Sequence, residues 1–417
     1  MSELSAGDEL GDRYVLDEEI GRGGFGVVWS AEDTDRDRTV ALKHPNYDGN
    51  AEDSLVDKYF EREYEVLEDI STAGDHPNIM TYFDRVEGHE LPFLVLELIE
   101  GSELGTVVRT DSPITDPDEV REIGIRICDA LSFLHDHDII YRDLKPDNIM
   151  LNGSLDPKLI DFTTAKGFVV EDEGPGFTDG SATSNGPGSD ADSTVPGEFK
   201  PPELNRGSDQ RQGPWSDVYS IGKLLCFLQV GWVPDEDGVA PGDFGVDSAD
   251  YLDEIIVQAT QHDHTERYPN ASMLKRALED RSATMPSRAT IEWLGRDQAW
   301  RIYPGDTIGR ETPDGPRPSI LLEDGSHKAL SAVHCRFETD DDGTWRVIDT
   351  SLNGTYISKH DEQEWQPLLS ETGQERRREA GESIPDDPAI DAELEDGDVV
   401  ALVSPSYPER FYFRFSQ

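Results

Sequence analysis

Hydrophobic and polar residues alternate with a period of two through much of the first hundred residues. The stretches YVLDEEI, VVWSAED and RTVALKH alternate in this way, and each predicts a strand. The stretch SLVDKYFEREYEVLEDI instead has Phe60, Tyr64, Leu67 and Ile70 on or near one face at helical spacing, so it predicts an amphipathic helix. The apolar run PFLVLELIE predicts a buried strand that leads into a turn.

The pattern changes after RSATMPSR, which ends at Arg288. From there the chain consists of short alternating stretches (ATIEWLG, AWRIYPGDTIGR, SILLED, HCRFETDDDGTWRVID and FYFRFSQ) with D-G and N-G turns between them. This pattern predicts an antiparallel β-sandwich of about 130 residues. A chain of 417 residues is long enough for two or three domains, so we expect a domain boundary here, with residues 281–288 as the linker.

The composition is strongly acidic, with 37 Lys and Arg against 88 Asp and Glu and a formal net charge of −51. Acidic residues occur in every stretch, which favours an adaptation of the whole surface over a single acidic site for a basic partner. Such acidic, lysine-poor chains are typical of salt-loving archaea. No stripe of Lys and Arg could displace the counterions of phosphates, so no nucleic acid is expected as a partner.

The three cysteines, Cys128, Cys226 and Cys335, are scattered and form no C-x-x-C pair, which favours buried thiols in a reducing compartment. Met1 leads straight into acidic residues, with no signal peptide. The longest apolar run, IGKLLCFLQVGWV, is too short and too interrupted to span a bilayer. We therefore expect a cytoplasmic protein without a membrane partner.

A glycine-rich stretch, IGRGGFGVVW, places Gly21, Gly23 and Gly26 in the spacing G-x-G-x-x-G. Dinucleotide-binding folds and protein kinases share this spacing, but a dinucleotide-binding loop opens a helix, whereas predicted strands flank this stretch on both sides. It therefore predicts a hairpin folded over phosphates, with Val28 placed to cover a base. The following V-A-L-K matches a pattern whose lysine, here Lys43, holds the α- and β-phosphates of ATP.

The stretch IIYRDLKPDNIMLN carries the pattern R-D-L-x-x-x-x-N from Arg142 to Asn148. Together with the glycine hairpin and V-A-L-K, in this order, it makes residues 10 to 280 resemble the eukaryotic-type serine/threonine protein kinases. The D-x-K order of Asp143 and Lys145 is that of the serine/threonine type and not of the tyrosine type.

The resemblance implies a two-lobed α+β protein kinase fold for residues 10–283, with an N-lobe of about 10–98 and a C-lobe of about 99–283. It also implies ATP and Mg²⁺ as cofactors, with Mn²⁺ as a substitute, because phosphoryl transfer needs alignment and charge neutralisation and Mg²⁺ prefers hard oxygen ligands. The residues that match the family motifs are Asp143, Lys145, Lys43 and Glu63 for catalysis, Gly21, Gly23, Gly24, Gly26, Val28, Ala41, Lys43, Glu97 and Ile99 for the nucleotide, and Asn148 and Asp161 for the metal.

Two positions depart from the family pattern. Thr163 follows Asp161-Phe162 where the family usually has glycine; it supplies no metal ligand, and its restricted backbone is expected to reduce switching to an inactive conformer. Tyr141 replaces a histidine, which active relatives also show. Neither change removes a catalytic group.

Other motifs imply structural roles. Glu203 of KPPEL is expected to form a buried pair with Arg267, and Asp217 and Gly222 are expected on a long buried helix that anchors the catalytic loop. The stretches HDHD at 135–138 and HDH at 262–264 look like metal clusters, but the first would end a helix in a kinase. We expect metal at neither.

Four short motifs follow in order in the second domain: Gly309-Arg310, Ser331-x-x-His334, Asn353-Gly354 and Gly397-Asp398. N-G alone is only a hairpin turn, but the ordered set resembles the forkhead-associated (FHA) domain, which binds phosphothreonine peptides. The resemblance implies an all-β FHA sandwich over residues 289–417. The segment 359–394, which contains QERRRE, is expected to be an inserted loop.

The resemblance assigns phosphopeptide binding to three residues. Arg310 offers a planar fork of donors for phosphate oxygens, Ser331 offers a hydroxyl, and Asn353 would hold the peptide backbone. His334 is expected to brace the loops from beneath. Ala332 stands where the family often has a basic residue, so the phosphate is expected to meet fewer donors.

The acidic stretch rich in Gly, Ser, Thr and Pro at 171–199 has the composition of a linker. It lies between Asp161 and Glu203, however, so the resemblance makes it the activation segment of the kinase. Its candidate phosphorylation sites are Thr178, Ser181, Thr183, Ser184, Ser189, Ser193 and Thr194. A phosphothreonine here is a candidate ligand for the surface of Arg310, Ser331 and Asn353.

These features predict an ATP-dependent kinase that phosphorylates serine and threonine in proteins, and in its own activation segment, and that binds phosphothreonine proteins through its FHA domain. The alternative is a kinase-like scaffold of weak activity, for which Thr163 is the best support. A kinase of small molecules is disfavoured by the sequence Asp-Leu-Lys-Pro that begins at Asp143.

Overall fold

The computed structural model describes residues 4–49, 51–87, 91–152, 156–167, 199–204, 212–296, 298–310, 312, 318–322, 329–340, 342–360, 364–385, 387–407 and 410–415. Its internal contacts divide the chain into two compact units, Met1–Thr284 and Met285–Gln417. The expected phosphorylation sites from Thr178 to Thr194 lie outside the described residues.

The first unit begins with an antiparallel sheet in the order β1-β2-β3-β4-β6-β5. Its strands are β1 (Glu9–Leu10), β2 (Tyr14–Arg22), β3 (Gly26–Asp33), β4 (Arg38–Pro45), β5 (Tyr82–Val86) and β6 (Phe93–Glu97). Helix α1 (Asp53–Ala73) packs beside β4 and β5 and buries Phe60, Leu67 and Ile70, while Tyr64 is only partly buried. The strands and the amphipathic helix expected from the periodicity are confirmed.

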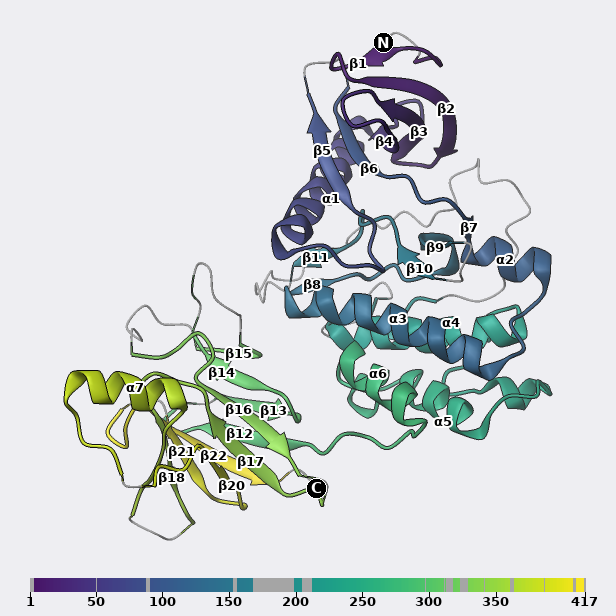
Figure 1. Cartoon of the computed structure of the whole chain (residues 1–417). Coiled ribbons are helices and arrows are strands. Elements are labelled where there is room, and N and C mark those ends of the chain that lie inside the picture. Colours follow the sequence, from purple (N-terminus) through teal and green to yellow (C-terminus); the bar gives the residue numbers. More distant parts are fainter. Residues whose placement is uncertain are drawn as a thin grey trace. The chain divides into compact units, whose positions relative to one another are not determined.

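Helices build the rest of the first unit (Figure 1). They are α2 (Leu104–Asp111), α3 (Pro117–Asp136), α4 (Pro214–Val230), α5 (Asp250–Ala259) and α6 (Ala271–Asp280), with 3₁₀ turns at Pro146–Asn148, Pro202–Leu204, Pro241–Phe244 and His264–Glu266. Short strands lie between the sheet and these helices: β7 (Ser102–Glu103), β8 (Ile139–Ile140), β9 (Ile149–Leu151), β10 (Pro157–Leu159) and β11 (Lys166–Gly167).

Helix α4 is the centre of this helical part. It is buried on all sides from Ser216 to Gln229, because α3, α5 and α6 pack around it. A Cβ atom on Gly222 would lie 2.6 Å from Cγ2 of Thr260, and one on Gly124 of α3 would lie 2.8 Å from Cδ2 of Leu225. Glycine at these two positions therefore permits close packing. The expected long buried helix is confirmed.

The second unit consists of two sheets with the orders β13-β12-β22-β21-β18-β19 and β15-β14-β16-β17-β20. Their strands are β12 (Ala289–Trp293), β13 (Ala299–Ile302), β14 (Thr307–Gly309), β15 (Ile320–Leu321), β16 (Cys335–Thr339), β17 (Trp345–Asp349), β18 (Thr355–Ser358), β19 (Gln366–Leu368), β20 (Asp391–Glu393), β21 (Val399–Leu402) and β22 (Arg410–Phe415). Both sheets contribute to one core, in which Ile291, Phe337, Trp345, Phe411 and Phe413 are buried. The expected β-sandwich is confirmed.

The expectation of an inserted loop at 359–394 is wrong. The segment contains β19, which pairs with β18, then helix α7 (Glu371–Ala380), then β20, which pairs with β17. Helix α7 has the sequence ETGQERRREA, which has no apolar stripe, so hydrophobic periodicity could not reveal it. Its N-cap is Ser370, whose side chain accepts a hydrogen bond from the backbone of Gly373.

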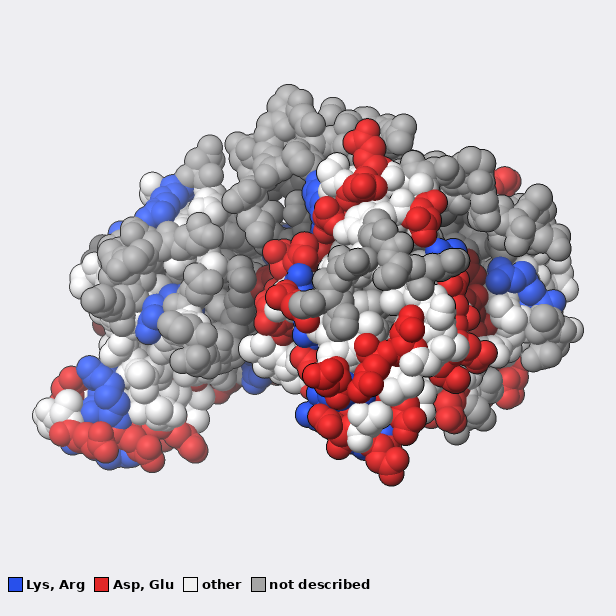
Figure 2. Space-filling model, turned by 90° about the horizontal axis from the view of Figure 1, so that it is seen from above, with Lys and Arg blue, Asp and Glu red and all other residues white. Residues whose placement is uncertain are grey.

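Figure 2 shows Asp and Glu spread widely over the described surface, with Lys and Arg in small separate groups. On this face, the acidic residues are not confined to one site. Among the helices of the described residues, none has the length and apolar character that crossing a membrane requires.

Candidate functional sites

Lys43 and Glu63 meet where the sheet of the first unit packs against α1. Lys43 lies on β4 and Glu63 on α1, and the Nζ atom of Lys43 is 2.6 Å from Oε1 of Glu63. The same Nζ lies 3.5 Å from Oδ1 of Asp161, which comes from the segment after β10. The structure therefore brings together three expected residues that are up to 118 positions apart, from 43 to 161, in the sequence.

Thr163 is a member of this cluster that sequence reasoning missed. Its hydroxyl lies 3.1 Å from Oε2 of Glu63, 2.5 Å from Oδ1 of Asp161 and 3.4 Å from Nζ of Lys43. Its backbone N–H also donates to Oδ1 of Asp161 (3.1 Å). The signal in the sequence that could have revealed this role is the hydroxyl of Thr163, two residues after the carboxylate of Asp161.

The charges of the cluster stabilise one another. Burial disfavours a charged Lys43, but the carboxylates of Asp161 and Glu63 outweigh it and hold the pKa of Lys43 above its usual value. Burial also favours neutral Asp161, yet the Lys43 ammonium and the hydrogen bonds from Thr163 lower the pKa of Asp161 to about 2. Burial raises the pKa of Glu63, although Lys43 opposes that rise.

The catalytic loop follows β8. Nζ of Lys145 lies 2.8 Å from Oδ2 of Asp143, and Nδ2 of Asn148 donates to the same Oδ2 (3.0 Å) and to the Asp143 carbonyl (2.9 Å). These contacts use the amide nitrogen of Asn148 and leave its amide oxygen as a ligand for a cation. The backbone N–H of Ile160, next to Asp161, donates to the Asn148 carbonyl (3.0 Å), so the two expected metal ligands lie on neighbouring segments.

Two residues of this region have a left-handed backbone that only glycine adopts easily: Arg142 has a φ of 70° and Asp161 a φ of 63°. The carboxylate of Asp217, buried in α4, accepts hydrogen bonds from the backbone N–H of Tyr141 (3.0 Å) and of Arg142 (2.8 Å). It therefore fixes the loop from the core, and the anchoring expected of Asp217 is confirmed.

The first histidine of HDHD, His135, contacts the same carboxylate of Asp217. Nε2 of His135, at the end of α3, lies 2.8 Å from Oδ2 of Asp217. In the second stretch, Nδ1 of His262 lies 2.8 Å from Oδ2 of Asp237. Within the described residues, no group of three or more His, Cys, Asp and Glu side chains could hold a metal ion.

The glycine-rich stretch forms the hairpin of β2 and β3. The backbone N–H of Gly23 donates to the carbonyl of Gly26 (2.8 Å), and a Cβ atom on Gly26 would lie 3.0 Å from Cε of Lys43, so the hairpin packs closely against this side chain. Val28 pairs with Lys43 and Gly21 with Val28 in the ladder, so these expected nucleotide contacts adjoin Lys43. The backbone of Gly24 belongs to the same turn.

The expected adenine contacts lie at the end of β6. Ala41 of β4 pairs with Leu96, and Glu97 is the last residue of the strand, two positions before Ile99. The Glu97 side chain accepts hydrogen bonds from Nζ of Lys158 at 2.8 and 2.7 Å. Its carboxylate therefore joins β6 to β10, which leaves a role toward a nucleotide to the backbone.

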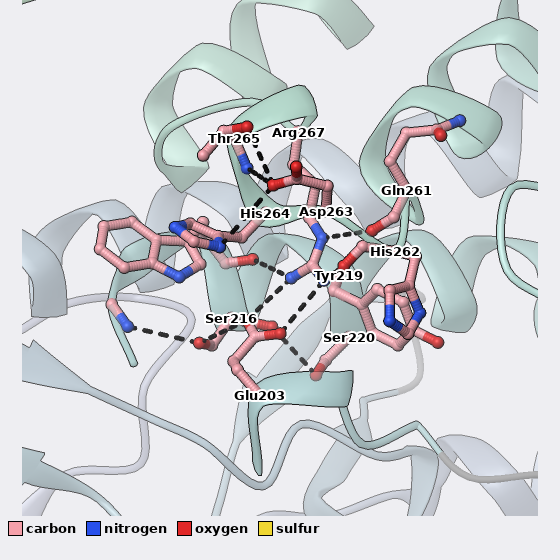
Figure 3. A network of polar contacts seen from close by, with 12 residues as sticks. Glu203, Ser216, Tyr219, Ser220, Gln261, His262, Asp263, His264, Thr265 and Arg267 are labelled. Carbon is pink, nitrogen blue, oxygen red and sulfur yellow. Dashed lines mark hydrogen bonds and ion pairs between the residues drawn. The ribbon is translucent and has the colours of Figure 1, made fainter. Parts of the chain in front are cut away.

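Glu203 and Arg267 form the expected buried pair (Figure 3). The guanidinium of Arg267 lies 2.8 and 3.1 Å from the two carboxylate oxygens, and neither side chain is exposed. Arg267 also donates to the carbonyls of Gln261 (2.6 Å), His262 (3.0 Å) and Trp215 (3.3 Å), while the Ser216 hydroxyl donates to Glu203 (2.9 Å). The pair joins three segments of the helical part.

In the second unit, Arg310, Ser331 and Asn353 come from three loops that meet at one end of the sandwich. Nε of Arg310 donates to the Leu330 carbonyl (2.5 Å), and Nδ2 of Asn353 donates to the Ala329 carbonyl (2.6 Å). The hydroxyl oxygen of Ser331 accepts from the backbone of Leu352 (3.1 Å). The loop 329–334, which carries Ser331, is thus the common partner of Arg310 and of the segment that carries Asn353.

His334 lies below this surface and is fully buried. Its Nδ1 accepts from the backbone of Ser331 (3.4 Å), and its Nε2 lies 3.0 Å from the Gly354 carbonyl, which requires a proton on Nε2. Burial lowers the pKa of His334, which keeps the ring neutral. The bracing role expected of His334 is confirmed.

Two protein-family models match this chain, one in each unit. Residues 14–279 match the family described as protein kinase domain, and residues 307–373 match the FHA domain. The first match covers more than half of the chain, so the chain belongs to the protein kinase family, and it carries an FHA domain in its second unit.

Particular relatives are serine/threonine-protein kinases. Serine/threonine-protein kinase PknB of Mycolicibacterium smegmatis is 30% identical over 339 residues, which cover 76% of this chain and 50% of the relative. Probable serine/threonine-protein kinase PknB of Corynebacterium glutamicum is 32% identical over 304 residues, covering 67% and 44%. The chain thus spans about half the length of the curated relatives it matches. These relatives do not support the archaeal source expected from the composition.

A solved structure, PpkA-294 in its apo form, superposes with a TM-score of 0.53 at 20% identity. The superposition covers 67% of this chain and 100% of that chain. It shows that the two share the protein kinase fold.

Proposed function

We propose that this protein is an ATP-dependent serine/threonine protein kinase whose FHA domain binds phosphothreonine proteins. The observation that supports the kinase activity is that polar contacts in the first unit bring the residues of the kinase motifs together. Lys43 is paired with Glu63, Asp161 lies beside Lys43, and Asp143 is bonded to both Lys145 and Asn148.

Each group has a role that its surroundings support. The Lys43 ammonium would hold the α- and β-phosphates, and Asp143 would accept or orient the proton of the substrate hydroxyl while Lys145 stabilises the transferred phosphoryl group. The oxygens of Asn148 and Asp161 fit Mg²⁺, and Mn²⁺ as a substitute, because both are hard ligands. When bound, the ion would neutralise charge on the phosphates.

The scaffold alternative rested on Thr163, and the contacts of Thr163 weigh against it. Its hydroxyl and backbone bond to Glu63 and Asp161 without displacing either from Lys43. A residue that supports the charged groups gives no reason for loss of activity.

Phosphate transfer from labelled ATP tests the kinase activity. The full chain is incubated with a basic protein, and alone, in Mg²⁺ or Mn²⁺ and at low and molar salt. Replacing Asp143→Asn or Asp161→Asn should abolish transfer to both acceptors. Asp147→Asn is the matched control, because Asp147 lies in the same loop and pairs only loosely with exposed Arg109 (3.3 Å). Transfer by the first two variants at the wild-type rate would reject the assigned roles.

Binding of phosphopeptides tests the FHA domain. We propose that its ligands include the protein's own activation segment, whose hydroxyl residues lie in an acidic sequence. Peptides that span Thr178, Thr183 or Thr194, with and without phosphate, are titrated against the full chain with Asp143→Asn, which prevents turnover. Phosphate-dependent binding that Arg310→Ala removes is expected; equal affinity for both forms of every peptide would reject this ligand.

Salt adaptation, a cytoplasmic location and the absence of nucleic-acid partners remain predictions from composition. The first is tested by chemical unfolding with and without molar KCl. A charge of −51 should make the folded chain more stable in salt, because screening reduces its self-repulsion. Equal stability under both conditions would contradict it.

A further inference from the structure

Helix α7 lies at the end of the sandwich that carries the phosphopeptide residues. Asn353 and Gly354 directly precede β18, whose first residue, Thr355, pairs with the last residue of β19, Leu368. Because the two strands are antiparallel, the chain that leaves β19 emerges beside Asn353. Helix α7 begins three residues later, at Glu371. The topology of the sheet therefore places helix α7 beside Asn353.

The start of α7 is tied to the loop that carries Asn353. The Ser370 hydroxyl donates to the Ser351 carbonyl (2.5 Å), and the Ser370 backbone donates to the buried carboxylate of Asp349 (2.7 Å). A Cβ atom on Gly373 would lie 2.9 Å from the Ser351 carbonyl oxygen, so the helix approaches the loop as closely as glycine allows. These contacts give α7 a defined position against the loop.

Arg377 is the cation of α7 that faces the loop. Its Nη2 donates to the Asn353 carbonyl (3.0 Å) and to the Tyr356 hydroxyl (2.9 Å). Its Nε is buried, and among the described residues it has no hydrogen-bond partner. The neighbouring arginines point to other partners: Arg376 pairs with Glu382 (3.0 Å) and Arg378 donates to Gln374 (3.1 Å).

We propose that α7 extends the phosphopeptide surface with the guanidinium of Arg377, so that the FHA domain selects phosphothreonine peptides with acidic residues beside the phosphothreonine. This inference rests on the proposed phosphothreonine binding. The surface otherwise has Ala332 where a base is common, so its described cations are few. The Arg377 guanidinium uses Nη2 for Asn353 and Tyr356 and buries Nε, which leaves the two donors of Nη1 for a ligand. The protein's own sequence offers such ligands, with Asp179 after Thr178 and Asp192 before Ser193-Thr194.

The test compares two phosphopeptides on matched variants of the full chain with Asp143→Asn. One peptide has the native sequence around Thr178, and the other replaces its Asp and Glu residues by Asn and Gln. Arg377→Gln should weaken binding of the acidic peptide about tenfold and of the neutral peptide less than twofold. Arg377→Lys should restore part of the preference, and Arg378→Gln, on the same helix, should leave it unchanged. Molar salt should remove the preference, because it screens the charges.

The outcomes separate this inference from the function on which it depends. Equal loss for both peptides would show that Arg377 only supports the loop, and no loss for either would place it outside the site. Binding of neither peptide by the parent chain, with phosphate present, would instead reject the phosphothreonine function itself. Thermal unfolding of each variant shows whether the sandwich is intact.

A separate observation concerns Thr163 in the first unit. The left-handed backbone of its motif falls on Asp161 and not on Thr163, so Thr163 needs no glycine-like conformation. Its hydroxyl oxygen lies within hydrogen-bond distance of Glu63 of α1 (3.1 Å) and of Asp161 of the metal motif (2.5 Å), and its single proton is donated to one of the two carboxylates at a time. We infer that Thr163 is a positioning residue that holds α1 and the metal motif in one arrangement before nucleotide binds.

Three substitutions separate the hydroxyl from the backbone. Thr163→Ser keeps the hydroxyl, Thr163→Val keeps the branched shape without it, and Thr163→Gly removes both. Val and Gly should each increase amide hydrogen exchange in α1 about tenfold in the protein without nucleotide, while Ser stays near wild type. In turnover, Val should lower kcat more than it raises the KM for ATP. Equal exchange in Val and wild type would overturn the inference, whether or not the enzyme turns over.

Discussion

Two glutamate–cation pairs in the first unit differ in how completely their neighbours satisfy them. Arg267 meets both oxygens of Glu203 and three backbone carbonyls, and both side chains are 0% exposed. Lys43 meets one oxygen of Glu63 at 2.6 Å but shares its charge with Asp161 and is 14% exposed. The first pair has its hydrogen-bonding capacity filled by the protein, whereas two of the three contacts of Lys43 Nζ, to Thr163 (3.4 Å) and Asp161 (3.5 Å), are long enough for a ligand to replace them.

The difference indicates that the Arg267–Glu203 pair serves stability and the Lys43–Glu63 pair serves activity. A buried charge that loses its partner is left uncompensated, and this costs several kcal/mol of folding free energy. The Lys43 side chain stays 14% exposed, and its contact with Asp161 is long (3.5 Å), so its ammonium can turn toward the phosphates of a bound nucleotide. We therefore expect one pair to report on folding and the other on phosphoryl transfer.

The largest effect is expected from Arg267→Met. It leaves the Glu203 carboxylate buried without its main partner and should lower the free energy of unfolding by about 3–5 kcal/mol. Denaturant unfolding followed by circular dichroism measures it. Arg276→Met is the control, because the Arg276–Asp280 pair is 69% and 62% exposed and should change stability by less than about 1 kcal/mol. A small loss for Arg267→Met would contradict the assignment of this pair to folding.

Lys43→Met should instead affect phosphoryl transfer strongly and stability weakly. Phosphoryl transfer should fall about 10²- to 10³-fold, because a preorganised charge at the phosphates is lost. The loss of stability should be smaller than for Arg267→Met, since Glu63 can take up a proton: burial already raises its pKa. Transfer is measured with labelled ATP and stability by the same denaturant unfolding.

The pH dependence of Lys43→Met sharpens the contrast. A carboxyl whose pKa is raised in the folded state binds more protons there than in the unfolded chain, so folding becomes more favourable as the pH falls from that pKa toward the lower pKa of the unfolded chain. The unfolding free energy of Lys43→Met should therefore recover, relative to wild type, as the pH falls through the raised pKa of Glu63 toward the unfolded value of about 4.3. A difference that stays constant over this range would show that Glu63 remains charged without Lys43.

A smaller effect on stability is expected from His334. Both of its ring nitrogens have hydrogen-bond partners, as the Arg267 guanidinium does, but the ring is neutral. Burial lowers its pKa, so the unfolded chain binds a proton near pH 6.5 before the folded chain does. Unfolding free energy should fall as the pH drops below about 6.5, by at most about 1.4 kcal/mol per pH unit. Denaturant unfolding at several pH values measures this dependence, and the fall of the unfolding free energy with decreasing pH should be smaller in His334→Gln.

The sequence predicted the parts of the molecule that depend on residue identity at fixed spacing. The glycine hairpin, the strand of Lys43 and the helix of Glu63 follow from local periodicity and motif order. The pairing of Glu203 with Arg267 was predicted from the resemblance, because no local pattern links two residues that lie 64 positions apart in the sequence.

What the sequence could not predict depends on three-dimensional contact. The bridge from Thr163 to Glu63 arises only when α1 packs against the metal motif, and the bond of His135 to Asp217 arises only when α3 packs on α4. Helix α7 escaped prediction for a different reason: its stability comes from a serine cap and from docking onto a loop, neither of which leaves a hydrophobic period.

The antiparallel pairing of β18 with β19 has a consequence for how this domain can change over time. The hairpin leaves and returns at the same end of the sandwich, so any segment added after Leu368 is delivered beside Asn353 while the core residues stay in place. New sequence at this point can alter which ligands are recognised without a search for a new fold. A changed segment after Leu368 would therefore alter ligand recognition while the core of the sandwich stays the same.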